Sequence, residues 1–132
     1  MLTRTLDEHT IVGGQILPRH VEELKAEGVT MIVNNRPDDE EPGQPSSTEV
    51  EAAARAAGLD YRHIPVGSSG LSAHQVDAMG EAIEQAEGKL LAFCRSGTRS
   101  TYLWALARAR KGDDPGEIVR KAGEVGYDLT PI

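Results

Sequence analysis

Short apolar clusters alternate along this chain with segments of helical periodicity, and this alternation restricts the possible folds more than any other feature. The clusters predict strands at Thr10–Val12, Val29–Val33, Tyr61–Val66 and Lys89–Phe93. The helical patterns run from Pro18 to about Glu27, from the cap Ser46 to Gly58, from the cap Ser72 to Gly88, from Ser100 to about Lys111, and from the cap Asp114 to about Val125. With right-handed crossovers, this order predicts an α/β fold in which helices cover both faces of a mainly parallel sheet.

Length and composition predict a single domain over residues 1–132. One cysteine cannot form an internal disulfide, so a reducing compartment is the simplest location. The sequence opens without an apolar segment of signal-peptide length, and no run approaches a membrane span, so we expect a soluble cytoplasmic protein with no membrane partner. The net charge of −7 argues against a nucleic-acid partner.

The only cysteine, Cys94, stands between the last predicted strand and the start of a helix. Ligands of parallel α/β sheets bind at the carboxyl ends of strands, and a helix start favours an anion. Arg95 and Arg99 add positive charge, and such surroundings favour the nucleophilic thiolate. A lone cysteine is more often a small buried residue of the core. Two arginines and Gly97 are unsuited to a buried apolar core, however, so we favour a functional cysteine.

A second polar cluster, Asn34–Asp38, follows the strand Val29–Val33 and would lie at the same edge of the sheet. Arg36 could bind an anionic substrate there, and Asp38 could orient that substrate or a neighbouring arginine. The alternative is an ordinary proline-containing turn whose charges face water. His63 fits a structural or exposed histidine better than a base. The remaining histidines show no metal-ligand spacing, so we predict neither a metal site nor a cofactor.

The segment from Cys94 to Ser100 resembles the signature of cysteine phosphatases, in which a cysteine and an arginine bracket an anion-binding loop. A serine or threonine then hydrogen-bonds the thiolate. The wider chain is similar to the phosphatase-like domain of beta-lactamase hydrolase-like proteins, in four blocks that together span nearly its whole length: Thr10–Gln15, Ile32–Asp38, His63–Val66 and Phe93–Ser100. This resemblance implies the dual-specificity phosphatase fold. It also implies either phosphatase or sulfur-transfer activity, and some members are fused to persulfide dioxygenase domains.

Two departures from the phosphatase pattern favour sulfur transfer. Only Arg95, Ser96, Gly97 and Thr98 separate Cys94 from Arg99, whereas the phosphatase loop has five residues there. The shorter loop should fit phosphate poorly, and its spacing resembles that of rhodanese sulfurtransferases. In addition, Gly67–Gly70 follows Ile64–Val66 where dual-specificity phosphatases commonly place a general-acid aspartate. Loss of a general acid forfeits roughly 10²–10⁴ in rate.

We therefore predict a rhodanese-like sulfurtransferase. Cys94 would take sulfane sulfur from thiosulfate or a small persulfide and pass it to cyanide, glutathione or a protein thiol, with a persulfide dioxygenase as a further candidate partner. The backbone N–H groups of residues 95–99, among them those of Ser96, Gly97 and Thr98, would hold the charged sulfur. Arg95 would attract the anionic donor, Arg99 would orient the loop or the donor, and Ser100 would donate to the thiolate.

Two alternatives remain open at this stage. The first is a phosphatase that forms a phosphocysteine at Cys94 and hydrolyses a phosphorylated substrate, with Asp38 or another acid of the run Asp38–Glu41 as proton donor. The second is a non-catalytic anion-binding or redox-sensing module with an oxidisable cysteine.

Overall fold

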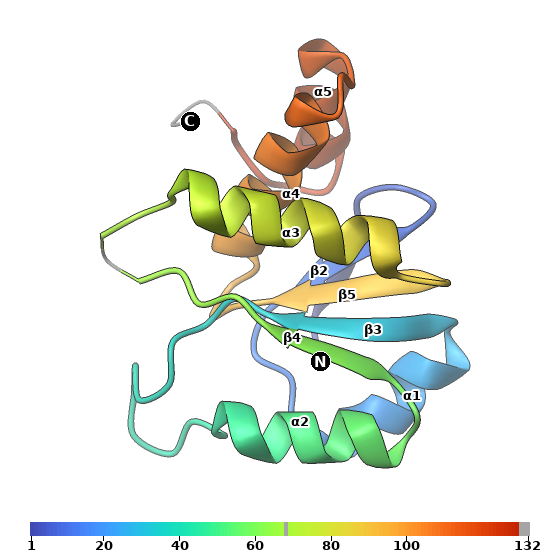
Figure 1. The fold of residues 1–132 in the computed structure, drawn as a ribbon, viewed down its shortest axis with the longest axis vertical. Coiled ribbons are helices and arrows are strands. Elements are labelled where there is room, and N and C mark those ends of the chain that lie inside the picture. Colours follow the sequence, from blue (N-terminus) through green and yellow to red (C-terminus); the bar gives the residue numbers. More distant parts are fainter. Residues whose placement is uncertain (68, 130–132) are drawn as a thin grey trace.

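A five-stranded sheet forms the centre of the protein, in a computed structural model that describes residues 1–67 and 69–129 (Figure 1). The strands lie in the order β1-β2-β5-β3-β4. β1 pairs antiparallel with β2, and the remaining pairs are parallel. Their bounds are β1 Thr3–Thr5, β2 Thr10–Gly13, β3 Val29–Asn34, β4 Asp60–His63 and β5 Lys89–Phe93. The predicted α/β class is confirmed, with an antiparallel edge strand that makes the sheet mixed.

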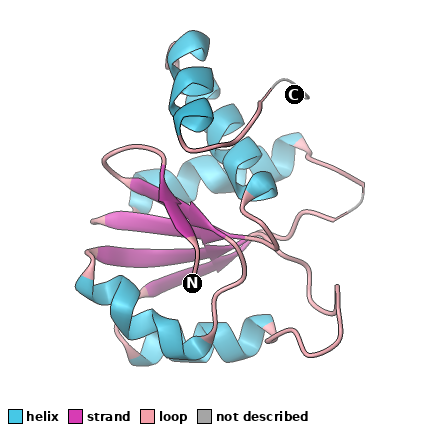
Figure 2. Cartoon of the chain, turned by 180° about the vertical axis from the view of Figure 1, so that it is seen from behind, coloured by secondary structure: helices cyan, strands magenta, loops and turns pink. Residues whose placement is uncertain are grey.

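Helices cover both faces of the sheet. α1 and α2 lie on one face, α3 and α4 lie on the other, and α5 extends beyond α4 (Figure 1). Figure 2 shows the same layers from behind. The bounds are the 3-10 turn η1 Pro18–His20, α1 Val21–Ala26, α2 Ser47–Ala56, α3 Ala73–Gln85, α4 Thr98–Arg110 and α5 Pro115–Glu124. In the described part of the chain, no helix combines the length and apolarity needed to cross a membrane.

Local signals define most element boundaries. Both predicted capping boxes form: the hydroxyls of Ser46 and Ser72 accept from the backbone N–H groups of Glu49 and Gln75. Two boundaries near the sheet's carboxyl edge differ from prediction. β4 ends at His63 rather than at residue 66, and α4 begins at Thr98 rather than at residue 100.

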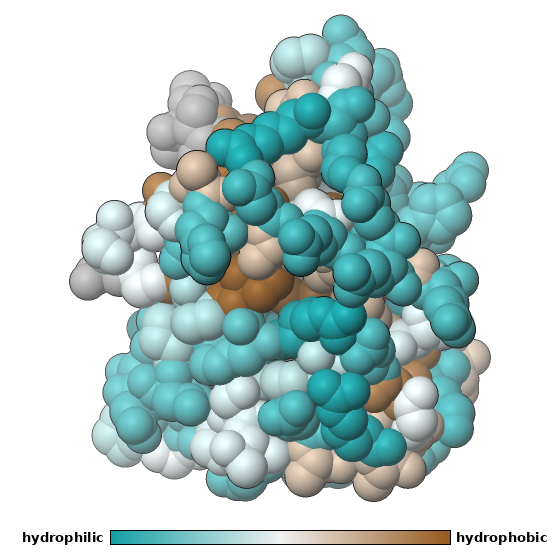
Figure 3. All heavy atoms as spheres, in the orientation of Figure 1, coloured by the Kyte–Doolittle hydropathy of each residue, from teal (hydrophilic) through white to brown (hydrophobic). Residues whose placement is uncertain are grey.

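The core forms two clusters, one on each face of the sheet. β5 contributes to both clusters because successive side chains of a strand point to opposite faces: Leu90 packs under α3 and α4, and Leu91 packs on the other side. Trp104 of α4 is 1% exposed, and its indole donates to Asp7. The face seen in Figure 3 is mostly hydrophilic, with apolar atoms visible between α3 and the sheet. This packing fixes the end of β5, where Cys94 follows.

Candidate active site

Cys94 follows β5 directly and lies at the base of a tight loop that leads into α4. Its side chain is buried, with 1% exposure, and its backbone N–H donates to the Gly13 carbonyl at 3.3 Å. The backbone N–H of Gly97 donates to Cys94 Sγ at 3.1 Å. Gly97 has φ +92°, a left-handed conformation that glycine adopts without steric cost. The glycine therefore turns a backbone donor onto the sulfur and begins α4 two residues earlier than predicted.

Arg99, in the first turn of α4, is held by groups from two other loops. Its Nη1 donates to Glu40 Oε2 at 2.7 Å and to the Val66 carbonyl at 2.6 Å, and its Nη2 donates to Glu40 Oε1 at 2.9 Å. In the described part of the chain, these three hydrogen bonds do not use the Nε–H or the second Nη2–H of Arg99. Both donors are therefore available to another acceptor. Hydrogen bonding to Glu40 raises the pKa of Arg99, burial opposes this, and the nearby Cys94 sulfur raises it further. The guanidinium of Arg99 therefore lies near the Cys94 sulfur, and two of its N–H donors are not used by Glu40 or Val66.

Glu40, in the loop after β3, bridges two arginines. It accepts from Arg99 and also from Nε of Arg36 at 2.8 Å. The hydrogen bonds from Arg99 lower the pKa of Glu40 to about 2, with burial opposing and Arg36 adding to the effect. Glu40 is therefore a carboxylate at neutral pH, and it cannot act as the proton donor that the phosphatase alternative sought in this loop.

Arg36 is 1% exposed, and all three of its nitrogens have partners. Besides Glu40, it donates to Gln15 Oε1 at 3.0 Å and to Glu41 Oε1 at 2.9 Å. The hydrogen bond from Arg36 lowers the pKa of Glu41, whose other oxygen lies 3.7 Å from the guanidinium of Arg95. Arg36, offered as a substrate-binding residue, here holds the two glutamates that pair with Arg95 and Arg99.

The remaining predicted site residues lie at or near this edge. Oδ1 of Asp38 accepts from the backbone N–H of Ser47 at 2.8 Å, which places the carboxylate at the start of α2. The hydroxyls of Ser96 and Thr98 lie 3.1 Å apart and share a hydrogen bond. Oγ of Ser100 is buried and has no hydrogen-bond partner among the described residues, so its donation to the thiolate stays a prediction.

Three contributors to the site escaped the sequence reasoning: the Val66 carbonyl, Gln15, and Glu40 as an arginine partner. In the sequence, Glu40 stands out only as one acid of the run Asp38–Glu41. Gln15 belongs to the block Thr10–Gln15, and the family resemblance of that block is the only feature of the sequence that points to Gln15 as a site residue. His63, expected to be structural or exposed, donates from Nε2 to the Arg36 carbonyl at 3.0 Å and so supports the loop.

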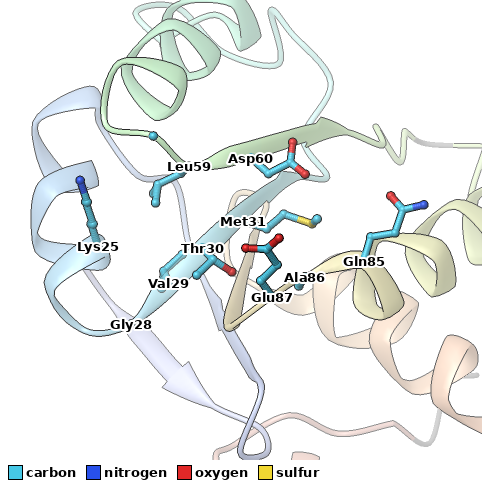
Figure 4. Close-up of a pocket in the computed structure, with 11 residues that line it drawn as sticks. Lys25, Gly28, Val29, Thr30, Met31, Leu59, Asp60, Gln85, Ala86 and Glu87 are labelled. Carbon is cyan, nitrogen blue, oxygen red and sulfur yellow. The ribbon is translucent and has the colours of Figure 1, made fainter.

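A separate pocket lies at the opposite end of the sheet, where β3, β4 and β5 begin (Figure 4). Lys25, Met31, Asp60, Gln85 and Glu87 are among its lining residues, and Cys94 is not. This hollow is therefore distinct from the cysteine site. Within residues 1–67 and 69–129, no cluster of three or more histidine, cysteine or acidic side chains could hold a metal ion.

The pKa of Glu40 leads to a stability prediction. A folded-state pKa of about 2, below the ordinary 4.5, contributes stability that is present above pH 4.5 and is lost as the pH falls toward 2. Glu40→Gln should therefore lower the free energy of unfolding by about 1–2 kcal/mol at neutral pH, with allowance for the partial exposure of this ion pair. Urea denaturation at a series of pH values checks this. The two proteins should converge in acid, and a constant difference would contradict the assignment.

Comparisons with known sequences identify similar proteins. Residues 2–111 match the family model described as beta-lactamase hydrolase-like protein, phosphatase-like domain. The chain is 36% identical over 125 residues to a beta-lactamase hydrolase-like protein of Agrobacterium fabrum and 35% identical to one of Xylella fastidiosa. These alignments cover 94% of this chain and 29% of each relative, so the chain corresponds to less than a third of those proteins.

Solved structures with a similar fold include several named as phosphatases. A proposed phosphatase of Neisseria meningitidis is 35% identical, with a TM-score of 0.82 over 96% of this chain and 90% of that one. Tk-PTP in its active form has a TM-score of 0.75 at 21% identity, covering 98% and 88% of the two chains. PTPMT1 has a TM-score of 0.70 at 14% identity, covering 98% and 85%. The last two matches show the fold alone, and together the neighbours confirm the dual-specificity phosphatase-like fold.

The sulfurtransferase prediction is wrong. The matching family model describes a phosphatase-like domain, and the structural neighbours are phosphatases by name. The number of residues between the cysteine and the arginine does not determine whether the loop can bind phosphate. The loop from Cys94 to Arg99 is one residue shorter than the phosphatase pattern, yet it still directs the Gly97 N–H to the sulfur and places Arg99 beside it.

Proposed function

Because the chain belongs to the family of phosphatase-like domains of beta-lactamase hydrolase-like proteins, we propose that it hydrolyses phosphate monoesters with Cys94 as the nucleophile. This proposal rests on the presence of two donor groups, one from the backbone and one from an arginine, at the sulfur of Cys94. The Gly97 N–H donates to Cys94 Sγ, and Arg99 lies beside the sulfur with unused donors. Backbone and guanidinium donors aimed at one point stabilise the charge that develops on a transferring phosphoryl group.

In the proposed reaction, the Cys94 thiolate attacks the phosphorus of the ester. The S–P bond forms as the P–O bond to the leaving group breaks, and the leaving oxygen takes the electron pair. Water then attacks the phosphorus of the phosphocysteine and loses a proton, the S–P bond breaks, and inorganic phosphate leaves with the thiolate restored. Arg99 would bind two equatorial oxygens through its Nε–H and free Nη2–H.

The carboxylates of the loop after β3 limit the substrates that this mechanism suits. Arginine hydrogen bonds lower the pKa of both Glu40 and Glu41, so neither supplies a proton to a leaving alkoxide. The carboxylate of Asp38 accepts from the Ser47 backbone N–H at the start of α2. Aryl esters leave as phenolates and need such help least. We therefore propose aryl phosphates, such as a phosphorylated tyrosine, as the preferred class of substrate.

A comparison of leaving groups tests this preference. The reduced protein should hydrolyse p-nitrophenyl phosphate with a kcat/KM at least about 10² higher than that for a simple alkyl phosphate, because general-acid assistance is worth roughly 10²–10⁴. Phosphate release from both esters should be measured at one pH. Equal values of kcat/KM would show that an acid protonates the leaving group and would overturn the preference.

The proposed function itself is tested by turnover and inhibition. The reduced protein should release phosphate from p-nitrophenyl phosphate, and orthovanadate, which mimics the five-coordinate transition state, should inhibit reversibly. A reduced, folded protein that hydrolyses no ester in a panel of aryl phosphates would contradict the proposal.

A further inference from the structure

The segment after α5 returns to the loop that follows Cys94. Tyr127 lies outside the range matched by the family model, and its backbone N–H donates to the Ala122 carbonyl at 2.9 Å. Leu129 is buried in the core next to it, with 5% exposure. Arg4 of β1 donates to the Val125 carbonyl at 2.7 Å, and its guanidinium lies 5.9 Å from the centroid of the Tyr127 ring. Both ends of this segment are thus anchored, and the tyrosine between them is held over the loop.

The Tyr127 hydroxyl donates to the backbone carbonyl of Ser96 at 3.1 Å. That carbonyl belongs to the same peptide unit as the Gly97 N–H, which donates to Cys94 Sγ at 3.1 Å. In a trans peptide the C=O and N–H point in opposite directions, and the described residues contain no cis peptide bond. One peptide unit therefore links the tyrosine hydroxyl to the cysteine sulfur.

We propose that Tyr127 is a positioning residue that keeps the Ser96–Gly97 peptide turned so that its N–H stays on the sulfur of Cys94. A hydrogen bond to the carbonyl also polarises the peptide unit and strengthens the bond made by its N–H. Tyr127 acts through the peptide and does not touch the substrate. The inference rests on the proposed use of Cys94 as the nucleophile, and it adds a part of the site that comes from outside the matched segment.

Steric and electrostatic observations support this link. A Cβ atom at residue 97 would collide with the Tyr127 hydroxyl, so glycine is needed both for its left-handed φ and for this contact. Burial raises the pKa of Tyr127, the charge of Arg4 opposes this, and the charge of Cys94 raises it further. The hydroxyl therefore stays protonated, as a donor must, across the neutral range.

The charged groups around the sulfur come from separate elements. Arg99 of α4 faces it directly, and Glu40 from the loop after β3 reaches it only through Arg99. Tyr127 belongs to the segment after α5, and the guanidinium of Arg4 lies over the Tyr127 ring. Tyr127→Phe removes one hydroxyl and changes none of these charges, so its effect reports the hydrogen bond.

The test measures how alkylation of Cys94 by iodoacetamide depends on pH. Tyr127→Phe should move the midpoint upward by about half to one pH unit, and should slow alkylation by about threefold to tenfold below the midpoint. Tyr102→Phe is the matched control, because Tyr102 lies on α4, is partly buried against the core, and has no part in the site. It should leave the midpoint unchanged. Phenylalanine keeps the ring that packs on Arg4, so the thermal unfolding midpoint should stay close to that of the parent protein.

An unchanged alkylation midpoint in folded Tyr127→Phe would overturn the inference, as would an equal shift in Tyr102→Phe. Hydrolysis of p-nitrophenyl phosphate separates this result from the proposed function. If the parent protein hydrolyses the ester and the midpoint does not move, the phosphatase proposal stands and the role of Tyr127 fails. If the midpoint moves and no ester is hydrolysed, the link to the sulfur is upheld and the phosphatase proposal fails.

Discussion

Cys94→Ser is expected to lower kcat for p-nitrophenyl phosphate by on the order of 10⁴-fold or more, because removal of an enzyme nucleophile leaves only binding and electrostatic contributions. Serine keeps the size of the side chain and an acceptor for the Gly97 N–H. Its hydroxyl, however, remains protonated at neutral pH and is a far weaker nucleophile than a thiolate. Steady-state release of p-nitrophenolate by the reduced proteins measures the effect.

A binding measurement is the control for this variant. Inorganic phosphate should bind Cys94→Ser at least as tightly as it binds the parent protein, because the arginine and backbone donors are unchanged and the negative charge of the thiolate is removed. Equal unfolding midpoints would show that the fold is retained. If the folded variant kept more than a tenth of the parent kcat, the nucleophile would have to be another group.

Arg99→Lys is expected to lower kcat/KM by about 10²–10³-fold, in the range seen when one donor to a transition-state charge is removed. Arg99 contacts Glu40 and the Val66 carbonyl with part of its guanidinium and keeps the Nε–H and an Nη2–H for the phosphoryl group. The single ammonium of lysine cannot do both, because it lacks the planar fork that binds two oxygens.

Arg95→Lys is the matched comparison for Arg99→Lys. Arg95 carries the same charge one residue after Cys94, but its side chain is 69% exposed and its contact with Glu41 is 3.7 Å long. We expect kcat/KM to fall less than about threefold, since exposed ion pairs contribute little. Equal losses in the two variants would show that general positive charge, rather than the geometry of Arg99, supports the reaction.

Most of the fold was predictable because its signals are local. Apolar runs, capping serines and terminal glycines located β2, β3 and β5 and the helices between them. β1 was missed because its three residues, Thr3–Thr5, are polar or charged, and only pairing with β2 makes them a strand. The end of β4 was misplaced because Ile64–Val66 looks like a strand. Pro65 lacks a backbone N–H, and Ile64 and Val66 donate to Asn34 and Asn35 at the edge of the sheet.

The site was predictable only to the extent that its parts are close in sequence. Cys94, Gly97 and Arg99 lie within six consecutive residues, so their chemistry could be inferred from the motif. The contacts of Arg99 with Glu40 and of Ser96 with Tyr127 join residues 59 and 31 positions apart, and only the folded chain brings them together. The choice of reaction failed for the same reason: the number of residues in the loop does not specify where its donors point.

The most direct test of a phosphatase that uses Cys94 is to stop a reaction with p-nitrophenyl phosphate by rapid denaturation and map the modified residue by mass spectrometry. We expect one phosphoryl group on the peptide that contains Cys94, formed as fast as p-nitrophenolate is released in the first turnover and absent from Cys94→Ser. Turnover without a phosphorylated enzyme, or with the phosphoryl group on any other residue, would contradict it.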